Sequence, residues 1–379
     1  MIVALFAFTP AGKLLRDSLA ELLKSRGHQI LPEPPQHSSL AERAARAFSS
    51  GDALVFIGAA GIAVRAIAPF LHSKTEDPAV TVIDEKGQWA VSLLSGHLGG
   101  ANAFTLEVAE LLGAQPVITT ATDINGVFAA DLWAKANGLA IGNMEKVRTV
   151  SMRLLQGEEI LLASEYPITG KIPQGIKVID SSQSSQLSQL SQLLQLSRSS
   201  QKSTGPKAGG AASLPGIRVS IYRKDGEDAL WLIPRCVYLG IGCRKGVGRE
   251  ALQHAVMEAL SRQAIDIRSV AAAGTIDIKK DEPALAAVCR EKGWPLLWYT
   301  ADELKAAGDG FTPSAFVFSA VGVDNVCERA AFLASRSGSL VISKFAGKGV
   351  TVAAAAEKIS LAFEAQALRA PRIPQGREQ

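Results

Sequence analysis

Short apolar runs alternate with amphipathic stretches along the first part of the chain. Continuous short apolar runs are typical of strands buried on both faces, whereas the leucines at helical spacing in residues 13–26 predict a helix. The turn sequence DEKG, residues 84–87, separates two apolar runs and predicts a β-hairpin. The predicted strands are 2–8, 53–57, 79–84, 89–94 and 116–119, and the predicted helices are 13–26, 62–71 and a stretch from residue 101. Because strands and helices alternate, residues 1–120 are predicted to form an α/β domain.

The second half of the chain shows a similar alternation. Residues 121–180 are predicted to form a middle segment, with a helix at 128–136 and strands at 159–163 and 177–180. Residues 216–365 are predicted to form a second α/β domain. Its predicted strands are 237–241, 267–272, 295–299, 339–343 and 350–354, and its predicted helices are 249–262, 282–292, a stretch from residue 301, and 325–335.

Between these parts the composition changes sharply. Residues 181–215 are rich in Ser and Gln, then in Gly and Ala, and are predicted to be a flexible low-complexity linker. Residues 366–379 form a polar tail. The predicted fold class is therefore α/β, with an N-terminal and a C-terminal α/β domain joined by a middle segment and a low-complexity linker.

The amino-acid composition argues against a nucleic-acid-binding protein and against a membrane-spanning one. The chain has 379 residues, of which 47% are hydrophobic and 20% charged, with a net charge of +4. This small, scattered excess does not form the basic patch that nucleic-acid binding requires, and no apolar stretch is long enough to predict a membrane span. The four cysteines lie far apart without metal-ligand spacing, so we expect free thiols in a reducing cytoplasm.

Four predicted strands run into glycine-rich loops. Glycine lets the backbone approach a ligand closely, and a following helix start favours carboxylate or phosphate. Because loops at the carboxyl ends of strands form the ligand crevice in open α/β sheets, we expect the loops to contribute to a binding site. For any one loop, the simpler interpretation is that its glycines allow a helix to pack on a strand. The four loops are FIGAAGIAVR, SLLSGHLGGAN, TTATDINGVF and LGIGCRKGVGRE.

These loops do not match the common nucleotide motifs. LGIGCRKGVGRE reads G-x-G-x-x-x-G, one residue longer than the dinucleotide fingerprint, and no suitably spaced acidic residue follows. The phosphate-binding-loop sequence is absent as well. A nucleotide-dependent oxidoreductase is therefore disfavoured. A serine-hydrolase triad is disfavoured too, since the chain contains no G-x-S-x-G.

His97 is the leading candidate for chemistry. It lies among glycines where a predicted strand gives way to a helix, a position that favours an exposed, functional side chain. Asp123 is most simply a turn former, and alternatively a proton carrier or a partner of His97. Arg65, Arg244 and Lys245 are candidate anion ligands beside helix starts, although a purely solvated role fits them as well. Lys344 and Lys348 add cations around glycines near the end of the chain.

Together these motifs resemble the cobalamin biosynthesis family CbiG, the cobalt-precorrin-5A hydrolases. The resemblance lies in GAAGIAVRAIAP, SLLSGHLGGAN, TTATDINGVFAADLWA, LGIGCRKGV, GTIDIKKDEPAL and GVTVAAA, in that order along the chain. It implies a hydrolase of anaerobic cobalamin (vitamin B12) biosynthesis that acts on a carbon–carbon bond. Such an enzyme opens the δ-lactone of cobalt-precorrin-5A and releases acetaldehyde to give cobalt-precorrin-5B. The alternative is a non-catalytic porphyrinoid carrier of the same pathway.

The resemblance also frames the expected site. Cobalt would arrive within the substrate, so no protein-bound cofactor is expected, and transient contacts with other corrin-pathway enzymes are compatible with the family. We expect His97 to act as a general base with Asp123, or to ligate the substrate cobalt. The residues expected to contact substrate are Gly58, Gly61, Arg65, Ser95, Gly96, Gly99, Gly100, Asn102, Gly242, Cys243, Arg244, Lys245 and Thr275.

Overall fold

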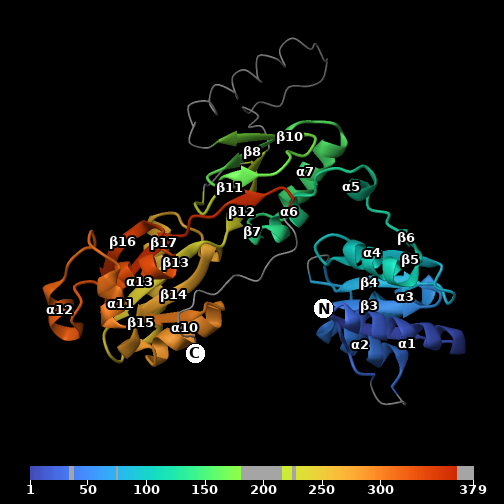
Figure 1. Cartoon of the computed structure of the whole chain (residues 1–379), viewed down its shortest axis with the longest axis horizontal. Coiled ribbons are helices and arrows are strands. Elements are labelled where there is room, and N and C mark those ends of the chain that lie inside the picture. The colour runs from blue at the N-terminus through green and yellow to red at the C-terminus, as the bar shows by residue number, and fades with distance from the viewer. Residues whose placement is uncertain (34–37, 74–75, 181–215, 224–227, 365–379) are drawn as a thin grey trace, which may run out of the picture. The chain divides into compact units, whose positions relative to one another are not determined.

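The computed structural model describes residues 1–33, 38–73, 76–180, 216–223 and 228–364 (Figure 1). The chain divides into two compact units, Met1–Leu132 and Trp133–Gln379. The α/β fold class predicted from the sequence is confirmed, because each unit combines helices with parallel or mixed sheets. The predicted linker 181–215 and the predicted tail 366–379 lie outside the described residues.

The first unit is built on one six-stranded sheet. Its order is β2 (Gln29–Ile30), β1 (Ile2–Ala7), β3 (Ala53–Ile57), β4 (Ala79–Ile83), β5 (Trp89–Leu94) and β6 (Gln115–Val117). Its helices are α1 (Pro10–Ser25), α2 (Leu40–Ser50), α3 (Ala60–Ile67), α4 (Ala101–Leu112) and α5 (Ala121–Ile124), with a 3₁₀ turn at Ala68–Phe70.

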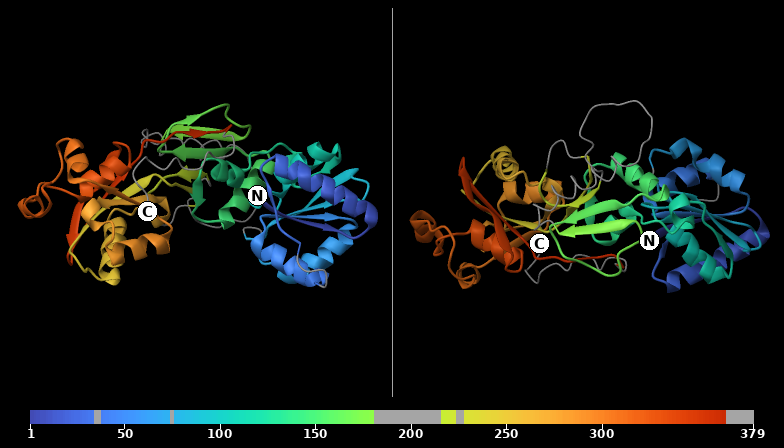
Figure 2. Two further views of the ribbon diagram at one scale, coloured as in Figure 1. Left: turned by 60° about the horizontal axis from the view of Figure 1, so that its bottom comes forward. Right: turned by 90° about the horizontal axis from the view of Figure 1, so that it is seen from above.

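Helices cover both faces of this sheet (Figures 1 and 2). In β1, Val3 and Leu5 pack with α1 and α4, whereas Ala4 and Phe6 pack with α2 and α3. Successive strand residues point to opposite faces, so a strand covered on both sides is apolar throughout. This explains the continuous apolar runs of the sequence.

The direction of β5 determines where its terminal loop lies. β1, β3 and β4 are parallel, β5 is antiparallel to β4, and β6 is parallel to β5. The hairpin predicted around DEKG is therefore confirmed. As a consequence, β5 and β6 end at the edge of the sheet where β4 begins, opposite to the edge where β3 ends.

The second unit contains a middle sheet ordered β10-β8-β11-β12-β7. Its strands are β7 (Leu139–Ile141), β8 (Ile160–Ser164), β10 (Ile176–Asp180), β11 (Ile217–Val219) and β12 (Leu230–Pro234), with helices α6 (Ala130–Ala136) and α7 (Glu145–Leu155). The division between the two compact units falls within α6. β11 and β12 pair with this sheet, although the sequence prediction begins the C-terminal domain at residue 216. The strands are too short for their sheet partners to be read from the sequence.

The C-terminal sheet is ordered β15-β14-β13-β17-β16. Its strands are β13 (Val237–Cys243), β14 (Val270–Ile276), β15 (Leu296–Tyr299), β16 (Ser339–Gly347) and β17 (Val350–Ala356). Its helices are α9 (Arg249–Arg262), α10 (Pro283–Lys292), α11 (Ala301–Ala306), α12 (Ala315–Val321) and α13 (Cys327–Ala334), with 3₁₀ turns at Ile267–Ser269 and Asp277–Lys279. β13, β14 and β15 are parallel, and β17 runs antiparallel to β13.

The end of the described chain returns to the middle region. β18 (Leu361–Ala362) pairs in parallel with β9 (Ile168–Thr169). The Trp133 indole and the Asn137 amide both donate to the carbonyl of Ala362, at 2.9 and 3.0 Å. No helix in the described ranges is long and apolar enough to cross a membrane.

Two glycines let α13 approach the C-terminal sheet closely. A Cβ on Gly240 would lie 1.7 Å from the carbonyl oxygen of Cys327, and one on Gly274 would lie 3.1 Å from that of Ala330. At Gly240 the simpler interpretation of the glycine-rich loop is therefore correct: the residue allows a helix to pack on a strand.

Gly240→Ala is expected to lower the free energy of unfolding by about 3 kcal/mol, because a helix backbone must move to admit the methyl group. Thermal unfolding of the whole chain measures the loss. Gly248→Ala is the matched control, since Gly248 has a φ of −70° and an added Cβ there meets no described atom within 4 Å. Equal melting temperatures for the two variants would contradict the packing argument.

Candidate active site and ligand cavity

The loop between β5 and α4 is folded tightly on itself. Ser95 has a left-handed φ of +58°, is 8% exposed, and its hydroxyl has no hydrogen-bond partner within the described part of the chain. A Cβ on Gly99 would lie 2.3 Å from that of Ser95, and one on Gly96 would lie 2.7 Å from Asn102 Oδ1. Gly100 caps α4 with a φ of +85°. The glycines therefore make room for the loop's own side chains, and a non-glycine residue with positive φ stores strain of the kind found at functional sites.

His97 is held between two carboxylates. Its Nδ1 lies 3.4 Å from Asp131 Oδ2, and its Nε2 lies 2.9 Å from Asp123 Oδ2 and 2.8 Å from Thr122 Oγ1. The side chain of His97 is 18% exposed, that of Asp131 9% and that of Asp123 36%. The imidazole is therefore positioned and largely covered, which differs from the exposed histidine that the sequence predicts.

The two carboxylates favour the protonated form of the histidine. The hydrogen bond to Asp131 raises the pKa of His97 above its usual value of 6.5, against the opposing effect of burial, and Asp123 adds to the increase. Burial acts to raise the pKa of Asp131, but the hydrogen bond and charge of His97 outweigh it and lower that pKa. Near neutral pH the arrangement thus suits an imidazolium that donates a proton.

Asn102 links the loop to the neighbouring strand end. Its Nδ2 donates to Thr120 Oγ1 at 3.0 Å and to Asp123 Oδ2 at 2.9 Å, and its Oδ1 accepts from the Ser92 hydroxyl at 2.7 Å. These contacts form because β5 and β6 are parallel, so the segments that follow them meet at one edge of the sheet.

The structure adds two residues to the site that the sequence analysis does not single out. Thr122 and Asp131 both contact the ring of His97, whereas the sequence singles out only Asp123 as its partner. Asp131 lies in a predicted helix, where an acidic residue ordinarily faces solvent. No motif next to Asp131 in the sequence marks it as a site residue. The fold of the sheet brings its carboxylate to His97.

The first glycine-rich loop is separate from this site. Gly58 and Gly61 follow β3, whose end lies at the opposite edge of the sheet from the end of β5. Arg65 is exposed, with its guanidinium donating to the carbonyl of Gly61. The expectation that loops at strand ends share one crevice is therefore wrong for these two loops, because it assumes that β3 and β5 run in the same direction. A substrate contact by Gly58, Gly61 or Arg65 stays a prediction.

A cavity of about 760 Å³ lies at the carboxyl end of β13. Gly242, Cys243, Arg244 and Lys245, all expected from the sequence to contact substrate, line one wall. The loop between β16 and β17 forms a second wall, because Val350 pairs with Cys243 and brings the turn to this edge. α12 forms a third wall. The other lining residues are Ile276, Ile278, Lys279, Ser314, Phe316, Val317, Ala320, Val321, Asn325, Val326, Cys327, Lys344, Ala346, Gly347, Lys348, Gly349, Val350 and Thr351.

This cavity combines positive charge with apolar surface. Its cations are Arg244, Lys245, Lys279, Lys344 and Lys348, and none of the described residues lining it is acidic. Lys279 is paired with Glu282 at 3.1 Å; the other four have no ion-pair partner in the described ranges. The cavity therefore suits a large apolar ligand that carries several carboxylates.

Two expected contacts have different surroundings. Burial raises the pKa of Cys243, only partly opposed by Lys279, so its thiol lines the cavity in the neutral form. Thr275 is fully buried, and its hydroxyl donates to the carbonyl of Ile241 at 2.7 Å. The structure thus places Thr275 in the sheet beneath the cavity and not on its lining.

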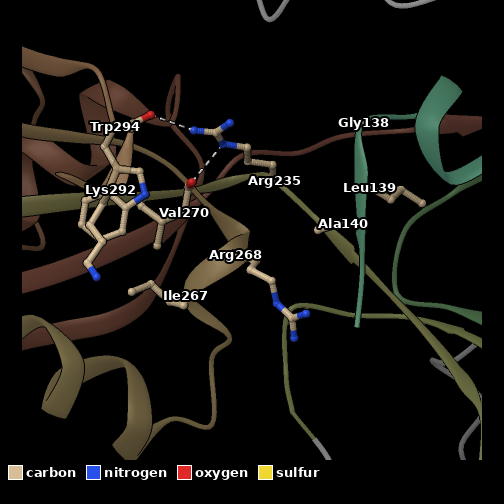
Figure 3. A pocket seen from close by; sticks show the side chains of 10 residues that line it. Gly138, Leu139, Ala140, Arg235, Ile267, Arg268, Val270, Lys292 and Trp294 are labelled. Atoms are coloured by element: carbon tan, nitrogen blue, oxygen red, sulfur yellow. Dashed lines mark hydrogen bonds between the residues drawn. The ribbon is translucent and has the colours of Figure 1, made fainter. Parts of the chain in front are cut away.

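A second pocket, of about 590 Å³, is lined by residues of the middle and C-terminal sheets (Figure 3). Arg235 donates to the carbonyls of Val270 and Gly293, both at 3.1 Å. Arg268 is bound to both oxygens of Asp266 and lies 5.5 Å from the Trp231 ring. Both arginines thus hold the backbone or a carboxylate in place, and the cavity at β13 is the better candidate for a polyanion.

Known proteins match the chain along most of its length. The family models described as cobalamin synthesis G N-terminal, cobalamin biosynthesis central region and cobalamin synthesis G C-terminus match residues 42–123, 128–234 and 237–355. A cobalt-precorrin-5A hydrolase of Salmonella typhimurium is 36% identical over 366 residues, which cover 92% of this chain and 96% of that protein. The chain belongs to the CbiG family.

One more relative and one solved structure are similar to the chain over most of its length. A cobalt-precorrin-5A hydrolase of Priestia megaterium is 33% identical, covering 81% of this chain and 79% of that protein. A solved structure of a cobalamin biosynthesis protein G homologue from Sulfolobus solfataricus is 21% identical over 94% of this chain and 96% of its own, with a TM-score of 0.38. Of the three regions that the CbiG family models match, the N-terminal one contains His97 and Asp123, and the central one contains Asp131. The C-terminal one contains the residues that line the cavity.

Proposed function

We propose that this chain is a cobalt-precorrin-5A hydrolase of cobalamin biosynthesis. It opens the δ-lactone of its substrate with one water molecule and releases acetaldehyde to give cobalt-precorrin-5B. The observation that carries the proposal is the 36% identity to the Salmonella hydrolase across 96% of that protein. The cobalt is part of the substrate, and the protein itself needs no cofactor.

The cavity at β13 supports this substrate class. A precorrin is a broad apolar macrocycle with carboxylates around its rim. Arg244, Lys245, Lys344 and Lys348 offer charges for the carboxylates, while Ile276 and Val326 offer apolar contact for the ring. We propose that this cavity binds the macrocycle.

The geometry around His97 supports acid–base chemistry at the lactone. Asp123, the more exposed carboxylate, accepts a proton from water as the hydroxide oxygen bonds to the acyl carbon. The His97 imidazolium donates its Nε2 proton to the ring oxygen as the acyl C–O bond breaks. Asp123 then returns its proton to His97 across their 2.9 Å contact, so both groups regain their starting charges.

The same groups serve the loss of acetaldehyde. The hydroxyl freed by lactone opening gives its proton to Asp123 and becomes the aldehyde carbonyl; Asp123 then releases this proton to water and is again a carboxylate. The carbon–carbon bond breaks, and its electron pair stays on the macrocycle. Asp131, which bonds Nδ1 and is largely buried, orients the imidazole throughout.

Incubation of the purified protein with cobalt-precorrin-5A tests the proposal. Release of one acetaldehyde per substrate, measured with an aldehyde-specific dehydrogenase, is the expected result. Tight binding of the substrate without aldehyde would support the alternative, a non-catalytic porphyrinoid carrier.

The charged walls of the cavity yield a separate prediction. The double variant Arg244→Gln/Lys344→Gln is expected to raise KM by roughly 10²–10⁴-fold with a smaller change in kcat, since each of the two charge-assisted contacts contributes about 1.5–3 kcal/mol. Lys305→Gln, which alters an exposed lysine of α11 outside the cavity, is the matched control. Steady-state kinetics at two salt concentrations measure the effect. An unchanged KM would remove the cavity from the substrate site.

We place the reaction in the cytoplasm. All four cysteines are free, and Cys236, Cys289 and Cys327 are buried, as expected for a reducing compartment. As partners beyond the substrate, we propose transient contacts with other corrin-pathway enzymes, those that supply cobalt-precorrin-5A or consume its product.

A further inference from the structure

The domain covers the apolar helix α12 only in part: Val317 and Val321 pack against one of its core clusters, whereas Phe316 and Phe318 are not part of that packing. The sequence of α12 is AFVFSAV, and none of its residues is buried. Phe316 is 76% exposed and Phe318 is 59% exposed. The helix stands apart from the C-terminal sheet in each view (Figures 1 and 2). Exposed apolar surface concentrated in this way marks a place where another molecule binds.

One side of α12 faces the cationic cavity. Phe316 and Val317 line that cavity, whereas Phe318 is not among the lining residues. Ile278, which is 64% exposed, lines the same cavity from the turn after β14. The cavity is thus bordered by large apolar side chains that solvent reaches, next to lysines and arginine without ion-pair partners in the described ranges. A ligand that covers both must be apolar on its face and anionic at its rim.

One buried carboxylate holds together the two ends of the segment that contains α12. Glu328 is 1% exposed. Its Oε2 accepts from the Thr312 amide at 2.6 Å and from Asn325 Nδ2 at 2.7 Å, and its Oε1 accepts from the Lys344 amide at 2.7 Å. Asn325 also donates to the carbonyl of Thr312. Residues 312–325, called the flap below, are therefore anchored at both ends beside the cavity wall.

Two glycines, one just before the flap and one within it, have backbone conformations and open surroundings that permit changes in their φ and ψ angles. Gly310 and Gly322 have φ values of +94° and +73°, and a Cβ added to either would meet no described atom within 4 Å. Hinges of closing segments are a few loop residues of this kind. A fixed base, glycines without close neighbours, and a helix held only by the half-buried Val317 and Val321 together allow α12 to move relative to the cavity.

We propose that the flap closes over a tetrapyrrole bound in the cavity, and that Phe316 packs on the face of its ring. This inference rests on the proposed function, which supplies the ligand class. Closure covers the phenyl ring and Ile278, which removes their apolar area from water, while the carboxylates of the ligand pair with the cavity lysines.

The test uses uroporphyrin III, a stable flat tetrapyrrole with carboxylates around its rim. Its affinity is measured by absorbance titration for the wild type, Phe316→Ala and Phe318→Ala. Phe316→Ala is expected to weaken binding roughly tenfold or more, as for a residue at the centre of an interface. Phe318→Ala, on the same helix but outside the lining, is expected to change affinity less than about twofold. Both side chains are exposed, so neither variant should affect folding.

Hydrogen exchange of the full chain, with and without uroporphyrin III, measures closure directly. Slower exchange of the amides of 315–321 in the presence of the porphyrin is expected. No binding by the wild type, equal affinities of the two variants, or unchanged exchange in α12 would each overturn the inference.

Acetaldehyde release, assayed in parallel, separates this inference from the proposed function. Binding that depends on Phe316 in a protein that releases no aldehyde would leave the flap in place and remove the hydrolase assignment. Aldehyde release by the wild type, together with normal porphyrin binding by Phe316→Ala, would support the hydrolase assignment and overturn the flap.

Discussion

His97→Ala is expected to lower the rate of acetaldehyde release by roughly 10²–10⁴-fold, the usual contribution of a general acid or base. The imidazole lies within hydrogen-bond distance of Asp123 and Thr122 and contacts Asp131, so its loss removes the proposed proton donor to the leaving oxygen. The measurement is single-turnover release of acetaldehyde from saturating cobalt-precorrin-5A.

His254→Ala is the matched control. His254 lies on α9, its side chain is 62% exposed, and its ring contacts only Glu258 among the ion pairs of the described residues. That variant should release acetaldehyde at the rate of the wild type. Near-normal turnover by His97→Ala would instead show that His97 has a structural role in its loop and no catalytic role.

Asp131→Asn is expected to lower kcat by a factor on the order of 10² or more, because the amide no longer favours the imidazolium or fixes its orientation. The sign of its pH effect follows from the raised pKa of His97, whose largest cause is the hydrogen bond to Asp131. In the proposed mechanism the imidazolium is the reactive form, so kcat/KM is expected to be full below the pKa of His97 and to fall as the pH rises through it. Loss of the carboxylate lowers that pKa and moves this decline to lower pH.

The pH profile of kcat/KM distinguishes positioning from stability. Asp302→Asn, at a side chain 94% exposed on α11, is the control and should leave the profile unchanged. A profile of Asp131→Asn with reduced height but the wild-type midpoint would contradict the role of Asp131. A rate that rises with pH through the pKa of His97 would make the imidazole a base.

Local sequence patterns are sufficient to predict most strands of the two α/β sheets, but not the two-residue strand β2. The hairpin at DEKG and the apolar strands follow from periodicity and turn chemistry alone. α12 is not predicted, because its seven residues are nearly all apolar and show no amphipathic period. α2 is also not predicted: its buried face consists of Ala44 and Ala47, which give little hydrophobic contrast.

The candidate site is only partly predictable from the sequence. His97 and the cations at residues 244–245 stand out because charge or imidazole beside glycine suggests chemistry at a strand end. Their neighbours depend on strand pairing over long separations. Asp131 reaches His97 only through the parallel pair β5 and β6, and Lys344 reaches the cavity only because β17 is antiparallel to β13.

Strand direction also explains the failure of the single-crevice prediction. Glycine-rich loops look alike in a sequence whichever way their strands run. The reversal of β5 sends the His97 loop to one edge of the sheet and leaves Gly58 at the other. The turn DEKG already implies this reversal, since a two-strand hairpin is antiparallel.

The return of β18 to β9 has a consequence for synthesis. All strands of the first sheet lie within residues 2–117, so this sheet has its full set of partners before the second unit is made. The Trp133 indole and Asn137, by contrast, wait for Ala362, made more than two hundred positions later. A ribosome stalled before residue 361 would therefore display a finished first sheet and an incomplete central region, so nascent-chain proteolysis should find the central region cleavable until Ala362 has been added.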